Sequence, residues 1–160
     1  MARHVSRIRA ALVAVALFAL TPALAHAGGG SRVMVDTPDA AAAALAPGAD
    51  LMVRAYDCGE ATNAAIEARA DGIVNGARKT IALKLMKTSQ TGVYGLARQW
   101  PSTGRWVLSF TPRRSDAATT IVRVEPAGGA KASVHLANTR LVDVKTAAKT
   151  IEAELRGRSS

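Results

Sequence analysis

Residues 93–110 read VYGLARQWPSTGRWVLSF and hold both tryptophans of this chain, one of its two tyrosines and one of its two phenylalanines. Large apolar side chains recur at every second residue on both sides of a break at Pro101 and Gly104, and this alternation predicts two strands joined by a turn. Aromatic side chains bury the most surface per residue, so a chain with few of them is expected to place them in its core. The stretch therefore predicts a β-hairpin with an aromatic core face.

The length of the connection decides which side chains share that face. With a loop of four residues, the large apolar side chains would be split between the two faces of the hairpin. With five loop residues, 101–105, Trp100 lies opposite Trp106 and Leu96 lies opposite Phe110. We therefore predict a loop of five residues, or of four with a bulge.

The two tryptophans are expected to differ in setting. Trp106 alternates with Leu108 along its strand and is predicted to belong to the core. Trp100 stands where its strand enters the loop, and two interpretations stay open for it: a lid over the core, or an exposed aromatic floor. In the second interpretation the candidate ligand or partner surface consists of Arg98, Trp100 and Arg105.

Residues 1–27 have the features of a secretory signal peptide: a basic beginning, an uncharged apolar run over residues 10–20, and small-residue sites ending at Ala25 and Ala27. The apolar run is shorter than the roughly 20 residues that a spanning helix needs, which argues against a membrane anchor. We expect cleavage after Ala25 or Ala27, and a mature protein that is periplasmic or secreted and has no transmembrane segment.

The chain is basic, with 21 Lys+Arg against 12 Asp+Glu and a formal net charge of +9. Cleavage after Ala27 removes three arginines and no acidic residue, which leaves a mature charge of about +6. Cys58 is the single cysteine, so no internal disulfide can form even in an oxidising compartment. A domain of this length can bury a sufficient core without such a cross-link.

Residues 28–48 are interpreted as a leader that contains a short strand pattern at 32–35 and an alanine-rich stretch. Thr37 can cap a two-turn helix there, with Pro38 at its first position and Pro47 at its end. An alanine-rich linker is the alternative, because isolated short helices are marginal.

Residues 49–142 are predicted to form the β-sandwich domain, since apolar residues alternate with polar ones in several short runs. Turn dipeptides stand at Asp71-Gly72 and Asn75-Gly76. The predicted strands cover residues 51–56, 64–71, 80–85 and 119–125, beside the hairpin and a further short strand at 132–136.

Residues 143–156 are predicted to form a C-terminal helix of about three turns. Asp143 is placed to cap its beginning and Gly157 lies just past its end. The apolar stripe recurs at helical spacing and consists of Val144, Ala148, Ile151 and Leu155. This stripe could pack on the sandwich or serve as an interaction helix for another protein.

Short strands separated by turns, without strand–helix alternation, predict an all-β antiparallel sandwich with a C-terminal α-helix. An immunoglobulin-like arrangement is the leading interpretation. Gly92-Val93-Tyr94, followed by Gly104-Arg105-Trp106 behind an exported β-rich segment, resembles the Gly-x-Tyr and Gly-x-Trp pattern of small periplasmic immunoglobulin-like modules of the YtkA-like type. The resemblance covers roughly residues 49–124 and rests on structural motifs. It implies the sandwich fold, and some members of that family accompany copper handling or oxidase assembly.

Few residues point to chemistry. Cys58 and His135 are the candidate metal ligands in the alternative reading of a periplasmic copper-handling accessory protein, but this sequence lacks a Met- and His-rich binding segment. Cys58 lies between Asp57 and Glu60, whose negative charge would weaken it as a nucleophile. No phosphate-binding loop, zincin helix or serine-hydrolase elbow is present. We therefore expect no catalytic residues and no cofactor.

The sequence favours a non-catalytic exported binding or interaction module. Its basic residues suit an anionic envelope component, or another periplasmic protein, as the partner, and export argues against nucleic acid. Scattered Lys and Arg also serve solubility and protect edge strands, which is the simpler explanation of the charge. A subunit whose enzyme partner carries the active residues is the third and weakest interpretation.

Overall fold

The computed structural model describes residues 30–114, 117–124 and 139–157. The predicted signal peptide at 1–27, the strand predicted at 132–136, and His135 lie outside the described residues. Among the described helices, none is long and apolar enough to cross a membrane.

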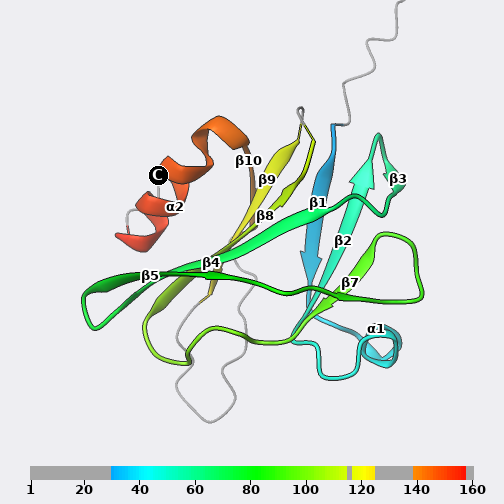
Figure 1. The fold of residues 1–160 in the computed structure, drawn as a ribbon, viewed down its shortest axis with the longest axis horizontal. Helices are drawn as coiled ribbons and strands as arrows, with labels where there is room; N and C mark the ends of the chain where they lie inside the picture. Colours follow the sequence, from blue (N-terminus) through cyan, green and yellow to red (C-terminus); the bar gives the residue numbers. More distant parts are fainter. Residues whose placement is uncertain (1–29, 115–116, 125–138, 158–160) are drawn as a thin grey trace, which may run out of the picture.

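Ten strands form two antiparallel sheets in the described part of the chain (Figure 1). This confirms the predicted antiparallel two-sheet organisation with a C-terminal helix. The first sheet has the order β1 (Arg32–Asp36), β2 (Leu51–Asp57), β7 (Val93–Leu96) and β6 (Met86–Lys87), with β3 (Glu60–Ala61) also paired to β2. The second sheet has the order β10 (Thr139–Asp143), β9 (Ala118–Val124), β8 (Arg105–Pro112), β4 (Ile66–Val74) and β5 (Ala77–Ala82).

The hairpin predicted for residues 93–110 is wrong. Its two strands belong to different sheets: β7 pairs with β2 and β6, and β8 pairs with β4 and β9. Residues 97–104 cross from one sheet to the other. The face assignment nevertheless holds, because Leu96, Trp100, Trp106 and Phe110 all belong to one buried core cluster. The two strands contribute to this core from opposite sheets, and so each sheet covers the apolar face of the other.

The strand predictions for β2, β4 and β9 are confirmed, with shifted ends. Asp71-Gly72 is not a turn but lies inside β4, where Asp71 is buried and accepts a hydrogen bond from the Thr80 hydroxyl at 2.6 Å. Asn75-Gly76 does form the turn between β4 and β5, with φ of 51° and 77°. Positive φ at both residues is the geometry of a two-residue type I′ hairpin. The short strands β3, β6 and β10 were not predicted.

The leader contributes to the sandwich. Strand β1 is the edge of the first sheet, so the sheet structure begins at Arg32 and not at Ala49. The alanine-rich stretch forms helix α1 (Ala40–Leu45), whose cap is Asp39 and not Thr37: the Asp39 carboxylate accepts a hydrogen bond from the Ala42 N–H at 2.8 Å. The helix packs on the outer face of the first sheet, in a cluster of Ala42, Ala46, Met52 and Val93.

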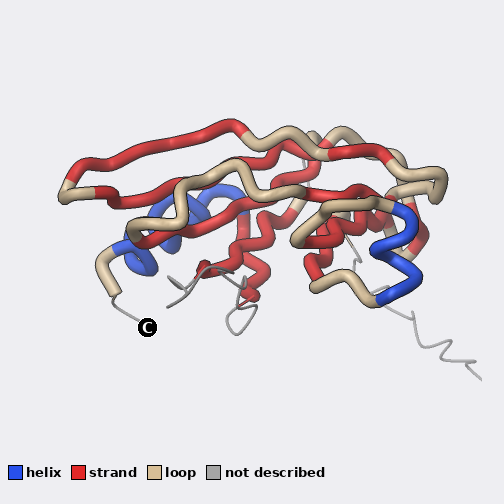
Figure 2. Tube along the Cα trace, turned by 90° about the horizontal axis from the view of Figure 1, so that it is seen from below, coloured by secondary structure: helices blue, strands red, loops and turns tan. Residues whose placement is uncertain are grey.

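The C-terminal helix α2 (Val144–Leu155) begins and ends as predicted. The Asp143 carboxylate accepts from the Lys145 N–H at 2.7 Å, and Gly157 follows the helix with φ of 73°. The buried face differs from the predicted one, since Val144 is 45 % exposed. The stripe that packs against Val107 and Ile121 of the second sheet consists of Ala147, Ile151 and Leu155. Figures 1 and 2 show α2 far from α1.

Charged groups also attach α2 to the sandwich. Glu154 is 4 % exposed and lies 3.5 Å from an Arg123 nitrogen and 3.6 Å from the Arg140 Nε. Near the same end, Glu152 accepts hydrogen bonds from Arg78 of β5 and from Arg156, and these bonds lower the pKa of Glu152. The apolar stripe of α2 is therefore docked on the sandwich of its own chain.

Candidate functional site

Trp100 is a core residue. The residue is 3 % exposed, and its Nε1 has no hydrogen-bond partner within the described residues. The Arg98 guanidinium lies over the ring, 5.8 Å from its centroid, and the Arg98 Nε donates to the Trp100 carbonyl at 3.2 Å. The Arg98 N–H donates to Asp50 at 2.7 Å. Arg98 and Trp100 thus hold the crossing segment in place, and Trp100 offers no open aromatic floor.

Arg105 contacts a different element. Its guanidinium donates to the Leu155 carbonyl at 2.7 Å, at the C-terminal end of α2, where carbonyl groups lack partners within the helix. Arg98 therefore contacts Trp100, whereas Arg105 contacts α2. The three residues of the predicted ligand surface do not surround one exposed ring.

The two candidate metal ligands are not both described. Cys58 is exposed in the turn between β2 and β3, with φ of 50°, and its thiol lies 3.9 Å from an Asp57 carboxylate oxygen. His135 lies outside the described residues. No group of three His, Cys, Asp or Glu residues that could hold a metal occurs in the described ranges. Copper handling stays a prediction.

Several basic side chains have acidic partners, among them Arg78 and Arg114, which belong to the basic residues expected to suit an anionic partner. Such exposed pairs contribute little stability, but they reduce the positive charge available to a ligand. The pairs are Arg54 with Asp36, Arg69 with Glu67, Arg78 with Asp71 and Glu152, and Arg114 with Asp57.

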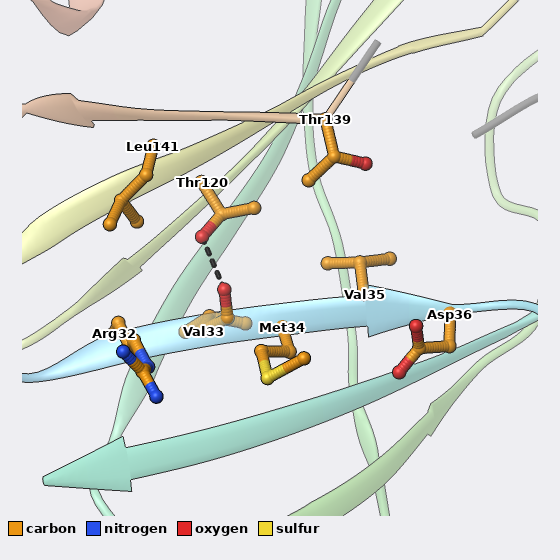
Figure 3. Close-up of a pocket in the computed structure, with 8 residues that line it drawn as sticks. All are labelled: Arg32, Val33, Met34, Val35, Asp36, Thr120, Thr139 and Leu141. Atoms are coloured by element: carbon orange, nitrogen blue, oxygen red, sulfur yellow. Dashed lines mark hydrogen bonds between the residues drawn. The ribbon is translucent and has the colours of Figure 1, made fainter. Parts of the chain in front are cut away.

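A groove lies between the edges of the two sheets in the described structure. Its volume is about 620 Å³, and its walls are β1 over its whole length, Thr120 of β9, and Thr139 and Leu141 of β10 (Figure 3). At one end the Ala118 N–H donates to the Ser31 carbonyl at 3.1 Å, which joins β9 to the beginning of β1. Further along, the Thr120 hydroxyl donates to the Val33 carbonyl. Strand β1 therefore lies against β9, and β10 projects past it.

Leu141 has an unusual position in this groove. It is paired with Thr120, so both side chains lie on the same face of the second sheet. Thr120 is 1 % exposed beneath β1, whereas Leu141 is 57 % exposed. Leu141 thus faces the inner side of the sandwich at a place that no described strand of the first sheet covers.

Sequence reasoning did not find the groove. The five residues of β10 gave too short a pattern, and the leader that contains β1 was placed outside the sandwich. The available signal was the alternation of Val33 and Val35 in the leader; Leu141 stands between Arg140 and Val142, where no alternation of apolar and polar residues marks it.

Two smaller adjoining hollows, of about 190 and 300 Å³, lie toward the other edge of the sandwich and share Asn63, Lys87 and Tyr94. Their polar groups hold the chain together. The Asn63 side chain accepts from the Gly92 N–H at 2.9 Å, and the Tyr94 hydroxyl donates to the Ala64 carbonyl at 3.3 Å. These hollows are better explained as a structural junction.

Comparison of the chain with family models, with curated proteins and with solved structures finds no match. The groove between β1 and β10 is therefore the candidate functional site on geometric grounds alone.

Proposed function

We propose that this protein is a non-catalytic, exported binding module with an immunoglobulin-like sandwich. The strand order supports this fold assignment: β1-β2-β7-β6 matches the ABED sheet of an immunoglobulin domain, and β9-β8-β4 matches its GFC sheet. Strands β5 and β10 extend the second sheet at its two edges. The resemblance to YtkA-like periplasmic modules agrees with this reading.

The groove between β1 and β10 carries the functional part of the proposal. It combines an apolar wall, Leu141, with exposed charged side chains at the two ends of β1, Arg32 and Asp36. Binding sites typically combine apolar area with a few polar groups that fix orientation. Among the described residues that line it, the hydroxyl groups come from Thr120 and Thr139. Such a site is suited to binding.

Export places the module in the cell envelope or outside the cell. The partner is then an anionic envelope component or another exported protein. Mass spectrometry of the protein made in its own cells should show a mature chain that begins at His26 or Gly28, because cleavage is expected after Ala25 or Ala27. An intact Met1 in the membrane fraction would contradict this location.

Site-specific photo-crosslinking tests the groove as the binding surface. Benzoylphenylalanine at position 141 should give covalent adducts in the envelope, because Leu141 lines the groove. The matched control is position 86, since Met86 is also a partly exposed apolar residue but lies on β6, at the opposite edge of the first sheet. Equal adduct yields at the two positions would reject the groove as the site.

A further inference from the structure

We infer that the groove binds an extended peptide segment of another protein, which adds to the first sheet as a strand beside β1. This inference rests on the proposed function and specifies the partner class. Peptides commonly bind exposed sheet edges in this way: main-chain hydrogen bonds give affinity, and pockets for alternate side chains give specificity.

The main chain of β1 has the required orientation. In an antiparallel pair, alternate residues direct both their N–H and C=O groups toward the partner strand. Val33 is paired with Ala55, whose own N–H and C=O bond to Gly92 and Thr62 on the side of β2 away from β1. Val33 likewise directs its carbonyl away from β2, to Thr120. Val35, two residues on, therefore directs its N–H and C=O into the groove.

These Val35 groups have no hydrogen-bond partner within the described part of the chain, although the residue is only 5 % exposed. Unpaired N–H and C=O groups at a sheet edge are a template for pairing with another extended segment.

The second sheet supplies a floor for such a strand. At this edge it extends one strand beyond β1, because β9 contacts β1 and β10 lies next to β9. A strand added beside β1 would lie over β10 and cover Leu141 and Thr139. Figure 3 shows these two side chains on the far side of Thr120 from β1. Every second residue of the peptide would face these two side chains and is expected to be apolar.

The charges of β1 favour an acidic residue in the peptide. Arg32 lies over the Tyr56 ring, 6.0 Å from its centroid, and has no carboxylate partner in the described ranges. Asp36, at the other end of β1, is 3.8 Å from the Arg54 Nε. A glutamate or aspartate on the outer face of the peptide, beside Arg32, would therefore complete an ion pair.

A second copy of the chain does not fit this position. Its β1 would bring its own β9 beneath it, into the space that β10 already occupies. A single extended segment brings no second layer, and so the geometry favours a peptide over a symmetric dimer.

A library of random linear 12-residue peptides displayed on phage, panned on the mature chain, tests the inference. We expect the enriched sequences to share apolar residues at alternate positions and an acidic residue. Leu141→Asp should lower the affinity for an enriched synthetic peptide at least about tenfold, because it replaces the apolar side chain that the peptide would cover. The matched control Met86→Asp should leave affinity unchanged. Leu141 is largely exposed, so its variant should keep the wild-type unfolding midpoint.

Methylation of the peptide nitrogens provides a readout that is specific to strand addition. Methyl groups on alternate amides should abolish binding for one set of positions and be tolerated for the other, because only one set faces β1. The inference would be overturned if methylation weakened binding equally at every position of the peptide. It would also be overturned if no peptide from the library bound the wild-type protein more tightly than the Leu141→Asp variant.

The crosslinking experiment separates the two levels of the proposal. If position 141 gave adducts with glycan or lipid and the library gave no enriched peptide, the proposed binding function would be supported and the peptide partner would be rejected. A monomer–dimer equilibrium that Leu141→Asp abolishes would assign the groove to a second copy and also reject the peptide. Equal crosslinking at positions 141 and 86 would reject the site itself.

Discussion

Replacing Trp106 by alanine is expected to lower the free energy of unfolding by about 3–5 kcal/mol, as large aromatic truncations in cores do. Trp106 is 1 % exposed. Its ring packs against Gly72 and donates its Nε1–H to the Thr103 carbonyl at 2.9 Å. A loss of this size is a large part of the roughly 5–15 kcal/mol by which domains are stable, so the variant should accumulate poorly.

Trp100→Ala should cost a comparable amount, because this ring is also buried and no exposed binding role remains for it. Urea or guanidinium melts of both variants measure the two losses. Leu141→Ala is the control, and its exposed position predicts a change within about 0.5 kcal/mol. A small loss for Trp106, or a fold left intact by Trp100→Ala, would show that the core is assigned wrongly.

Gly72→Ala is the second substitution with a large expected effect. A Cβ at position 72 would lie 2.3 Å from Cε3 of Trp106, which is closer than two carbons can approach. The Trp106 ring is fixed by the surrounding core, so either the ring or β4 must shift. Overpacking of this kind typically costs about 1–3 kcal/mol.

A double-mutant cycle identifies the cause of that loss. In the Trp106→Leu background, Gly72→Ala should cost much less, because the smaller side chain leaves room for the new methyl group. Denaturant melts of the four proteins give the coupling. A stabilising effect of Gly72→Ala in the wild type, as seen where glycine is replaced without strain, would contradict the close packing.

The periodicity of the sequence predicted part of the core, but not which strands are neighbours. Trp106 and Phe110 are buried as the period-two pattern indicates, whereas the pattern left open whether Trp100, now seen to be buried, is core or exposed. That pattern assigns each residue to a face and is the same for a hairpin as for two strands in facing sheets. Eight residues, 97–104, separate β7 from β8. This connection is longer than the tight turns that define hairpins, and it can cross the sandwich.

The groove depends on neighbours that are distant in the sequence, which is why it could not be predicted. Leu141 lies far along the chain from β1, and its exposure follows from the absence of a described strand above it. Asp71-Gly72 illustrates the same limit: its composition indicates a turn, but the packing of Gly72 on Trp106 and the bond from Thr80 to Asp71 keep it in a strand. Tertiary contacts overrode the local preference.

The claim that β1 is an open strand edge is tested most directly by the hydrogen-exchange rates of its amides, measured by NMR in the mature protein. The Met34 N–H bonds to β2 and should exchange slowly, whereas the Val35 N–H faces the groove and should exchange faster in the free protein. A bound peptide from the library should slow exchange at Val35 and leave Met34 unchanged. Equal protection of Val35 and Met34 in the free protein, or a Val35 rate that the bound peptide does not alter, would contradict the open edge.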